Sequence, residues 1–187
     1  MTHETRGGTP RLVVLGEETV PALRENQMIE AAGYVNVNER MAELGLTSPA
    51  GVVLLPRGFA DVSGSHELLD ESDALDLVKL LKSEGVDAAL VTRKGEKLPT
   101  IAEHDILAHL PDLLLQGVTV GMIPITLGVI GNYVYDKLIG TFVKPDVRLN
   151  VIVKRQDGEY TRVSYQGPVD GLKVLEKTIQ EAVRDDH

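Results

Sequence analysis

Apolar and polar positions follow one another in short blocks along the chain, and these blocks predict alternating strands and helices. Two continuous apolar runs, residues 12–15 and 51–55, stop at Gly16 and Pro56. Runs of this length without polar positions are typical of strands buried on both faces of a sheet. Because such strands are usually covered by helices, the pattern favours an α/β fold.

The segment between these two runs predicts a helix, an edge strand and a few further helical turns. Thr19 is a suitable N-cap for a helix that has Pro21 in its first turn and Gly33 after its end. Residues 34–38 alternate and predict an edge strand, and residues 39–44 allow one or two helical turns.

The clearest predicted helix follows the second buried strand. Its apolar residues recur at intervals of three and four and share one face; they are Ala74, Leu77, Val78 and Leu81. The spacing predicts a helix over residues 72–84, and residues 86–91 are expected to form the next strand. This order predicts a right-handed crossover between parallel strands. A further helix is expected over residues 100–110.

The last forty residues follow a different pattern, in which apolar and polar positions alternate one by one. Residues 147–155 alternate, the chain turns at Asp157-Gly158, and residues 160–165 return. Asp-Gly between two alternating runs is a strong hairpin signal. A helix that begins near Asp170 follows, and its apolar stripe consists of Leu172, Leu175, Ile179 and Val183.

These patterns divide the chain into four expected parts. They are a disordered tail (1–9), an α/β domain (10–110), an apolar connector (111–145) and a ββα module (146–187). The first domain is expected to be a small three-layer α/β domain with a mainly parallel sheet. Because about forty residues bury little surface alone, the ββα module is expected to pack on another part of the chain or on another copy.

Residues 113–135 contain no charged side chain, which is the most unusual feature of the sequence. Pro124 marks the expected start of a helix over residues 124–138. The segment is long enough to cross a bilayer, which takes about 20 residues. The alternatives are an oligomer interface and a buried connector between the two domains, and the pattern favours the buried connector. The interface candidates are the apolar residues of the predicted helix: Leu127, Ile130, Tyr133, Val134 and Leu138.

Composition and charge exclude several classes of protein. The 187 residues carry 28 acidic and 19 basic side chains, a formal net charge of −9. This excess of acid argues against a protein that neutralises nucleic-acid phosphates, so no nucleic-acid partner is expected. The sequence has no cysteine, which excludes disulfides and thiolate metal sites and fits a cytoplasmic location.

Motifs for cofactors, metals and catalysis are absent from the sequence. It contains neither G-x-G-x-x-G nor G-x-x-x-x-G-K-[ST], so no nucleotide cofactor is expected. His104 and His109 are five residues apart and would point in different directions on a helix, so no metal site is expected there. No catalytic residue is assigned.

The remaining ligand-binding candidates follow the second buried strand, because ligands of α/β folds gather at the carboxyl ends of strands. These candidates are Arg57, Asp61, Asp70 and Glu71. Their alternative interpretation is an exposed turn followed by the acidic beginning of a helix, where negative charge suits the helix dipole.

The last third of the chain resembles a known group of proteins in its arrangement. Residues 132–138 (Asn-Tyr-Val-Tyr-Asp-Lys-Leu) end an apolar helix, which precedes the alternating strand 147–155, the turn at Asp157-Gly158, the strand to Tyr165 and the helix to Val183. This order is similar to that of small effector-associated modules of bacterial conflict systems. The resemblance implies a module that couples a partner to an effector domain.

Three functions are therefore compatible with the sequence. The first is a non-enzymatic bacterial protein-interaction or adaptor protein, whose partner is another protein or a second copy of the chain. The second is a small-ligand-binding α/β enzyme that acts at the carboxyl ends of its strands. The third is a membrane-associated effector that acts through residues 113–135.

Overall fold

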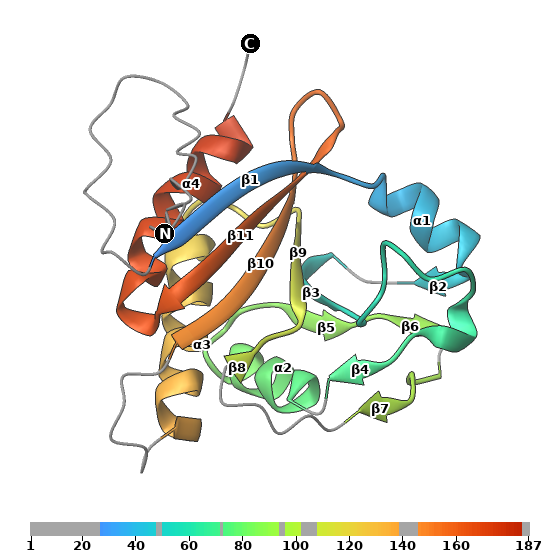
Figure 1. Cartoon of the computed structure of the whole chain (residues 1–187), viewed down its shortest axis with the longest axis horizontal. Helices are drawn as coiled ribbons and strands as arrows, with labels where there is room; N and C mark the ends of the chain where they lie inside the picture. Colours follow the sequence, from blue (N-terminus) through green and yellow to red (C-terminus); the bar gives the residue numbers. More distant parts are fainter. Residues whose placement is uncertain are drawn as a thin grey trace, which may run out of the picture.

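The computed structural model describes residues 27–47, 50–71, 73–93, 96–101, 108–138 and 146–184 (Figure 1). The strands are β1 (Met28–Tyr34), β2 (Leu46–Thr47), β3 (Gly51–Leu55), β4 (Asp70–Glu71), β5 (Ala88–Leu90), β6 (Thr92–Arg93), β7 (Thr100–Ile101), β8 (Ala108–His109), β9 (Asp112–Gln116), β10 (Asp146–Lys154) and β11 (Tyr160–Pro168). The helices are α1 (Val37–Glu43), α2 (Ala74–Ser83), α3 (Met122–Leu138) and α4 (Leu172–Arg184), with 3-10 turns η1 (Ser65–Glu67) and η2 (Val169–Gly171).

The main sheet of the described residues confirms the α/β class but is mixed. Its strand order is β1-β11-β10-β9-β3-β5, and β8 pairs with β10 beside β9. The pairs β1/β11, β10/β11 and β3/β9 are antiparallel, whereas β9/β10, β8/β10 and β3/β5 are parallel. The expectation of a mainly parallel sheet is therefore wrong. The reason is that the C-terminal hairpin pairs directly with β9 and belongs to the same sheet as the predicted α/β domain.

Two predicted units are confirmed. Strands β3 and β5 are parallel and are joined through α2, whose buried residues are the predicted Ala74, Leu77, Val78 and Leu81. The hairpin of β10 and β11 turns at Asp157-Gly158, where Gly158 has a φ of 92°. A positive φ is easily reached only by glycine, which explains why this residue marks the turn.

The N-terminal predictions are partly outside the described residues and partly wrong. The predicted strand 12–15 and the first part of the predicted helix lie outside them. Residues 28–32, expected to be the last part of this helix, belong instead to β1, because all seven residues of β1 pair with β11 and Ile29 and Ala31 pack on the core. Of the expected strand 34–38, only Tyr34 is in a strand, as the end of β1. Residues 37 and 38 begin α1, and its N-cap Asn36 accepts a hydrogen bond at Oδ1 from the Glu39 amide at 3.3 Å.

The expected helix over residues 100–110 is also wrong at both ends. Residues 100–101 form β7, which pairs with β4, and residues 108–109 form β8, which pairs with β10. Pairing with distant strands overrides the local apolar spacing here. Residues 102–107 lie outside the described part of the chain.

The uncharged segment forms a strand and a helix that pack on each other within the fold. Residues 113–116 belong to β9, at the centre of the sheet, and α3 follows after a short turn. Helices α2, α3 and α4 pack against one face of the sheet in a single hydrophobic core (Figure 1). Among the described residues, no helix has the length and apolar character required to cross a bilayer.

The interface candidates of α3 lie in this core. Leu127, Ile130, Tyr133 and Val134 are at most 9% exposed and contact the same apolar cluster as the sheet. The Leu138 side chain lies outside the described residues. These four side chains are therefore covered by the chain itself, because the apolar side of α3 packs on β9 and β10 and against α4.

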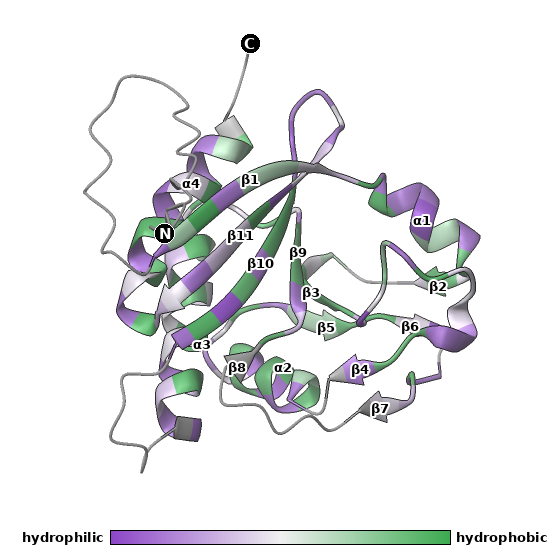
Figure 2. Ribbon diagram, viewed as in Figure 1, coloured by the Kyte–Doolittle hydropathy of each residue, from purple (hydrophilic) through white to green (hydrophobic). Residues whose placement is uncertain are grey.

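The opposite face of the sheet is covered only in part. A second apolar cluster lies over β3 and β9 and includes side chains from α1 and from the loops that follow β3 and β5. Over β10 and β11, hydrophilic and hydrophobic residues alternate along each strand (Figure 2). On β10 the helix-facing residues are buried, whereas Arg148, Asn150 and Lys154 point to the other face. This polar part of the sheet contains the candidate site.

Candidate functional site

Four polar residues meet on the partly covered face of the sheet, and we call them the polar cluster: Tyr34, Asp112, Asn150 and Arg162. The sheet register brings them together. Asp112 and Asn150 lie side by side because the next residues along, Leu113 and Val151, are partners in the parallel pair β9/β10. Arg162 of β11 is opposite Ala32 of β1, two residues before Tyr34. The cluster therefore spans four adjacent strands.

Two contacts connect the members of the polar cluster in pairs. Asn150 Nδ2 donates a hydrogen bond of 2.7 Å to Asp112 Oδ1. The Arg162 guanidinium carbon lies 5.7 Å from the centre of the Tyr34 ring, a distance typical of a cation–π contact. The cluster thus offers a guanidinium, a phenol and an amide next to one carboxyl group.

Arg162 is the member of the polar cluster whose hydrogen-bonding groups are not all used. Its Nε is buried and has no hydrogen-bond partner among the described residues. Within the same part of the chain, no carboxylate lies within ion-pairing distance of its guanidinium. A buried polar nitrogen without a hydrogen-bond partner is unfavourable, even though the Tyr34 ring and the charge of Asp112 stabilise the guanidinium. A hydrogen-bond acceptor from a bound partner would supply the contact that the Arg162 Nε lacks.

Burial changes the acid–base behaviour of the two ionisable neighbours of Arg162. It raises the pKa of the Asp112 carboxyl, while the hydrogen bond from Asn150 and the charge of Arg162 act in the opposite direction. Burial also raises the pKa of Tyr34 above its usual range, and the negative charge of Asp112 adds to this effect. Tyr34 therefore stays protonated at neutral pH and can donate a hydrogen bond.

Arg40 of α1 fixes the loop that borders the polar cluster. Its Nε donates to the Phe59 carbonyl oxygen at 3.0 Å, a terminal nitrogen donates to the Val62 carbonyl oxygen, and another pairs with Glu43 at 3.0 Å. The loop carries Asp61, which is close enough to Tyr34 to contribute to its raised pKa. Asp61 is therefore the one predicted ligand candidate that lies near the cluster.

The other predicted ligand candidates lie on the far side of this loop. The Arg57 amide donates to the Leu69 carbonyl oxygen at 2.8 Å, which places Arg57 beside the strand that begins with Asp70. Asp70 is 5% exposed, and burial raises the pKa of its carboxyl to about 6. The Glu71 side chain lies outside the described residues. The four candidates are thus divided between two places.

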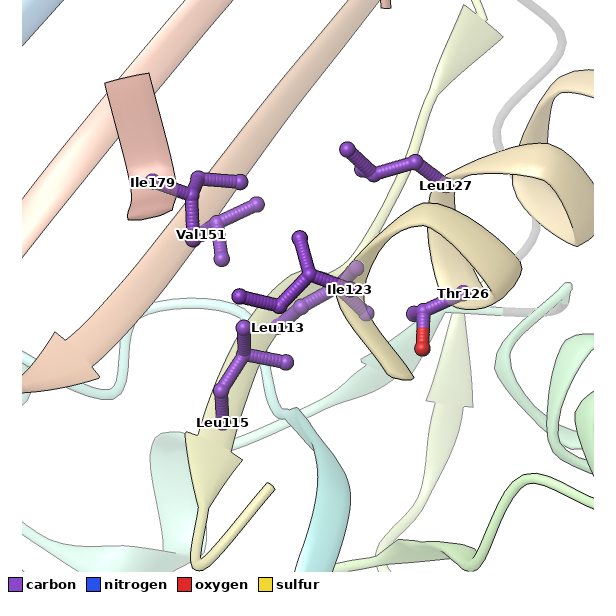
Figure 3. Close-up of a pocket in the computed structure, with 7 residues that line it drawn as sticks. All are labelled: Leu113, Leu115, Ile123, Thr126, Leu127, Val151 and Ile179. Carbon is purple, nitrogen blue, oxygen red and sulfur yellow. The ribbon is translucent and has the colours of Figure 1, made fainter. Parts of the chain in front are cut away.

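A small gap between the sheet and the helices gives no ligand site. It lies between α3, α4, β9 and β10 (Figure 3) and is lined by Leu113, Leu115, Ile123, Leu127, Val151, Ile179 and the side chain of Thr126. Thr126 Oγ1 is already engaged, because it donates to the Met122 carbonyl oxygen at 2.9 Å. The gap does not admit a water molecule, so it belongs to the core. No group of three His, Asp or Glu suited to a metal occurs in the described ranges.

Sequence reasoning assigned none of the four residues of the polar cluster to a functional site. The alternation of residues 147–155 placed Arg148 and Asn150 on one face, and the same pattern applies to Arg162. The neighbours of these side chains depend on the register between β9, β10, β11 and β1, which no local pattern contains. Asp112 was visible only as the charged residue before the uncharged segment.

Comparisons of the chain with protein-family models, with curated proteins and with solved structures found no match.

Proposed function

We propose that this chain is a protein-interaction module without a reaction of its own, and that it binds an extended segment of a partner along β1. In this mode the partner adds a strand to the sheet, and its backbone supplies most of the affinity. The polar cluster lies on the sheet face next to the added strand, where it contacts the side chains of that strand. The resemblance of residues 132–183 to effector-associated modules favours the same function.

The observation that carries this proposal is the outer edge of β1. No strand of the described residues pairs with that edge, although β1 is seven residues long and is the outermost strand of the sheet (Figure 1). In an antiparallel pair about half of the backbone groups point away from the neighbouring strand. The edge therefore presents a row of donors and acceptors that fits an extended chain.

The polar cluster gives this edge a chemical preference. Arg162 is the second side chain in from the edge, since it is opposite Ala32, whose side chain is small. A carboxylate on an added strand would lie across Ala32 from the Arg162 guanidinium. An acidic side chain at one position of the partner strand is therefore favoured, with the Tyr34 phenol as a second donor.

A peptide-binding experiment tests the proposal. Short random peptides displayed on phage are selected on the full chain, and the affinity of an enriched peptide is then measured for variants. We expect enriched peptides to carry an acidic residue, and we expect Arg162→Gln to weaken binding by about tenfold or more. Arg148→Gln is the matched control, because Arg148 lies on the same face but already bonds Gln166 at 2.9 Å. Equal losses for both variants, or no enrichment, would contradict the proposal.

Ligand binding or catalysis at the carboxyl ends of the strands is a second candidate function, and Asp70 is the observation that favours it. A buried carboxyl whose pKa is raised to about 6 is suited to proton transfer near neutral pH. Asp70 also lies beside the backbone of Arg57, at the end of β3. Loss of a measured activity in Asp70→Asn, with the stability gain described in the Discussion, would support this function.

A further inference from the structure

Edge strand β1 has few of the features that usually prevent edge-to-edge pairing. Proteins protect edges by short strands, charged side chains (lysine above all), proline or bulges, and Glu30 is the one such residue in β1. Strand β1 contains neither lysine nor proline, and all seven residues are in continuous register with β11, without a bulge. The opposite edge of the sheet, β5, is only three residues long. Strand β1 is therefore the edge of the sheet that is better suited to pairing with another strand.

Symmetry restricts how two copies of β1 can pair. An antiparallel pair with two-fold symmetry needs one residue opposite its own copy. If Ala31 is this residue, all seven residues of β1 find a partner. If Glu30 is central instead, two carboxylates lie directly opposite each other, which is unfavourable. The arrangement centred on Ala31 is therefore preferred.

This register brings complementary side chains together on the face that carries the polar cluster. Glu30, the one charged residue of β1, lies opposite Ala32 of the second copy. Ala32 is in turn the β11 partner of Arg162. Glu30 of each copy is thus in the same row across the strands as the guanidinium of the other copy, which has no carboxylate partner among the described residues.

The same register also explains an exposed apolar side chain. Met28 is 57% exposed, the largest value among the exposed large apolar residues of the described ranges. In the pair centred on Ala31, Met28 lies opposite Tyr34 of the second copy. Contacts between a methionine sulfur and an aromatic ring are favourable, so the pairing covers Met28.

We propose that a second copy of this chain is the partner that pairs with β1, around a two-fold axis at Ala31, with Glu30 of each copy bound by Arg162 of the other. This inference rests on the proposed function and names its partner. The sheets of the two copies then form one continuous sheet. Because the contact is limited to one strand and its neighbours, its area is small and the dimer is expected to dissociate in the micromolar range.

Sedimentation of the full chain over a wide concentration series tests the inference, with variants in which the charges of Glu30 and Arg162 are reversed. We expect Glu30→Arg and Arg162→Glu each to raise the dissociation constant of the dimer about tenfold or more, since each removes two symmetric ion pairs. The double variant, which exchanges the two charges, should restore the dimer. Glu84→Arg, the same charge change at the exposed end of α2, should leave the dissociation constant unchanged.

If Arg162→Glu does not fold, Glu30→Arg alone still tests the inference, because Glu30 is an exposed side chain and its replacement does not disturb the core. A dimer that is insensitive to Glu30→Arg, or a chain that stays monomeric at every concentration, overturns the inference. If the monomer still binds a selected peptide along β1, the proposed function stands and only the identity of the partner is wrong. A monomer whose β1 amides are already protected from exchange would contradict both, because the outer edge would then be covered without a peptide or a second copy.

Discussion

Replacing Ile130 by alanine is expected to lower the free energy of unfolding by about 2–5 kcal/mol. Ile130 is 0% exposed and lies at the centre of α3, against the sheet and the core that α4 shares. Removal of its side chain loses buried apolar surface and leaves a cavity in a closely packed core. The same substitution in an oligomer interface would mainly weaken association. Chemical denaturation at low protein concentration measures the difference.

Helix α3 contains its own matched control. Ile125 is 45% exposed, so Ile125→Ala removes the same atoms from the surface of the same helix. We expect this variant to change the free energy of unfolding by less than about 0.5 kcal/mol. If Ile130→Ala were as mild as Ile125→Ala, the core position of the uncharged segment would be wrong.

Replacing Asp70 by asparagine is expected to stabilise the fold above neutral pH by roughly 2–3 kcal/mol. Burial raises the pKa of the Asp70 carboxyl from 3.8 to about 6, and each pKa unit corresponds to about 1.4 kcal/mol. Above pH 6 the folded protein must therefore hold a buried, ionised carboxyl at a cost in stability. Asparagine has nearly the same shape and carries no charge.

The gain from Asp70→Asn must depend on pH in a defined way. Below pH 3.8 the carboxyl is protonated in both the folded and the unfolded chain, so its ionisation contributes nothing. Between pH 3.8 and about 6 the folded chain binds more protons than the unfolded chain, and wild-type stability falls as pH rises. The difference between variant and wild type should therefore grow through this window and then level off.

Thermal and chemical unfolding at several pH values measure this difference. Asp87→Asn, at an exposed position before β5, removes the same charge and is expected to leave stability unchanged. If Asp70→Asn destabilised the fold at every pH, the carboxylate would be a structural acceptor and the raised pKa would not hold.

Local patterns predicted those elements whose sequence and tertiary partners agree. The spacing of Ala74, Leu77, Val78 and Leu81 defines one helix face, and that face is buried. The hairpin of β10 and β11 was predictable because Asp157-Gly158 and the alternation on both sides specify the same structure. In both units the contacts are close in sequence or follow a standard crossover.

The remaining elements depend on contacts that are distant in sequence. Met28, Glu30 and Ala31 favour a helix locally, but pairing with β11, more than a hundred residues away in the chain, makes them a strand. The pattern of the uncharged segment favoured a buried location but did not exclude an interface or a bilayer, because an apolar helix occurs in all three. The polar cluster was beyond prediction for the same reason, since Tyr34 and Arg162 are neighbours only through the strand register.

Amide hydrogen exchange along β1 is the most direct test of the central claim, that the outer edge of this strand is the interaction surface. The full chain is measured with and without a peptide selected on it, at a concentration at which the chain is monomeric. We predict that the outward-facing amides of residues 28–34 exchange more than about tenfold more slowly with the peptide, while those of residues 88–90 in β5 do not change. Unchanged exchange in β1, with protection on α2, α3 or α4 instead, would contradict the account.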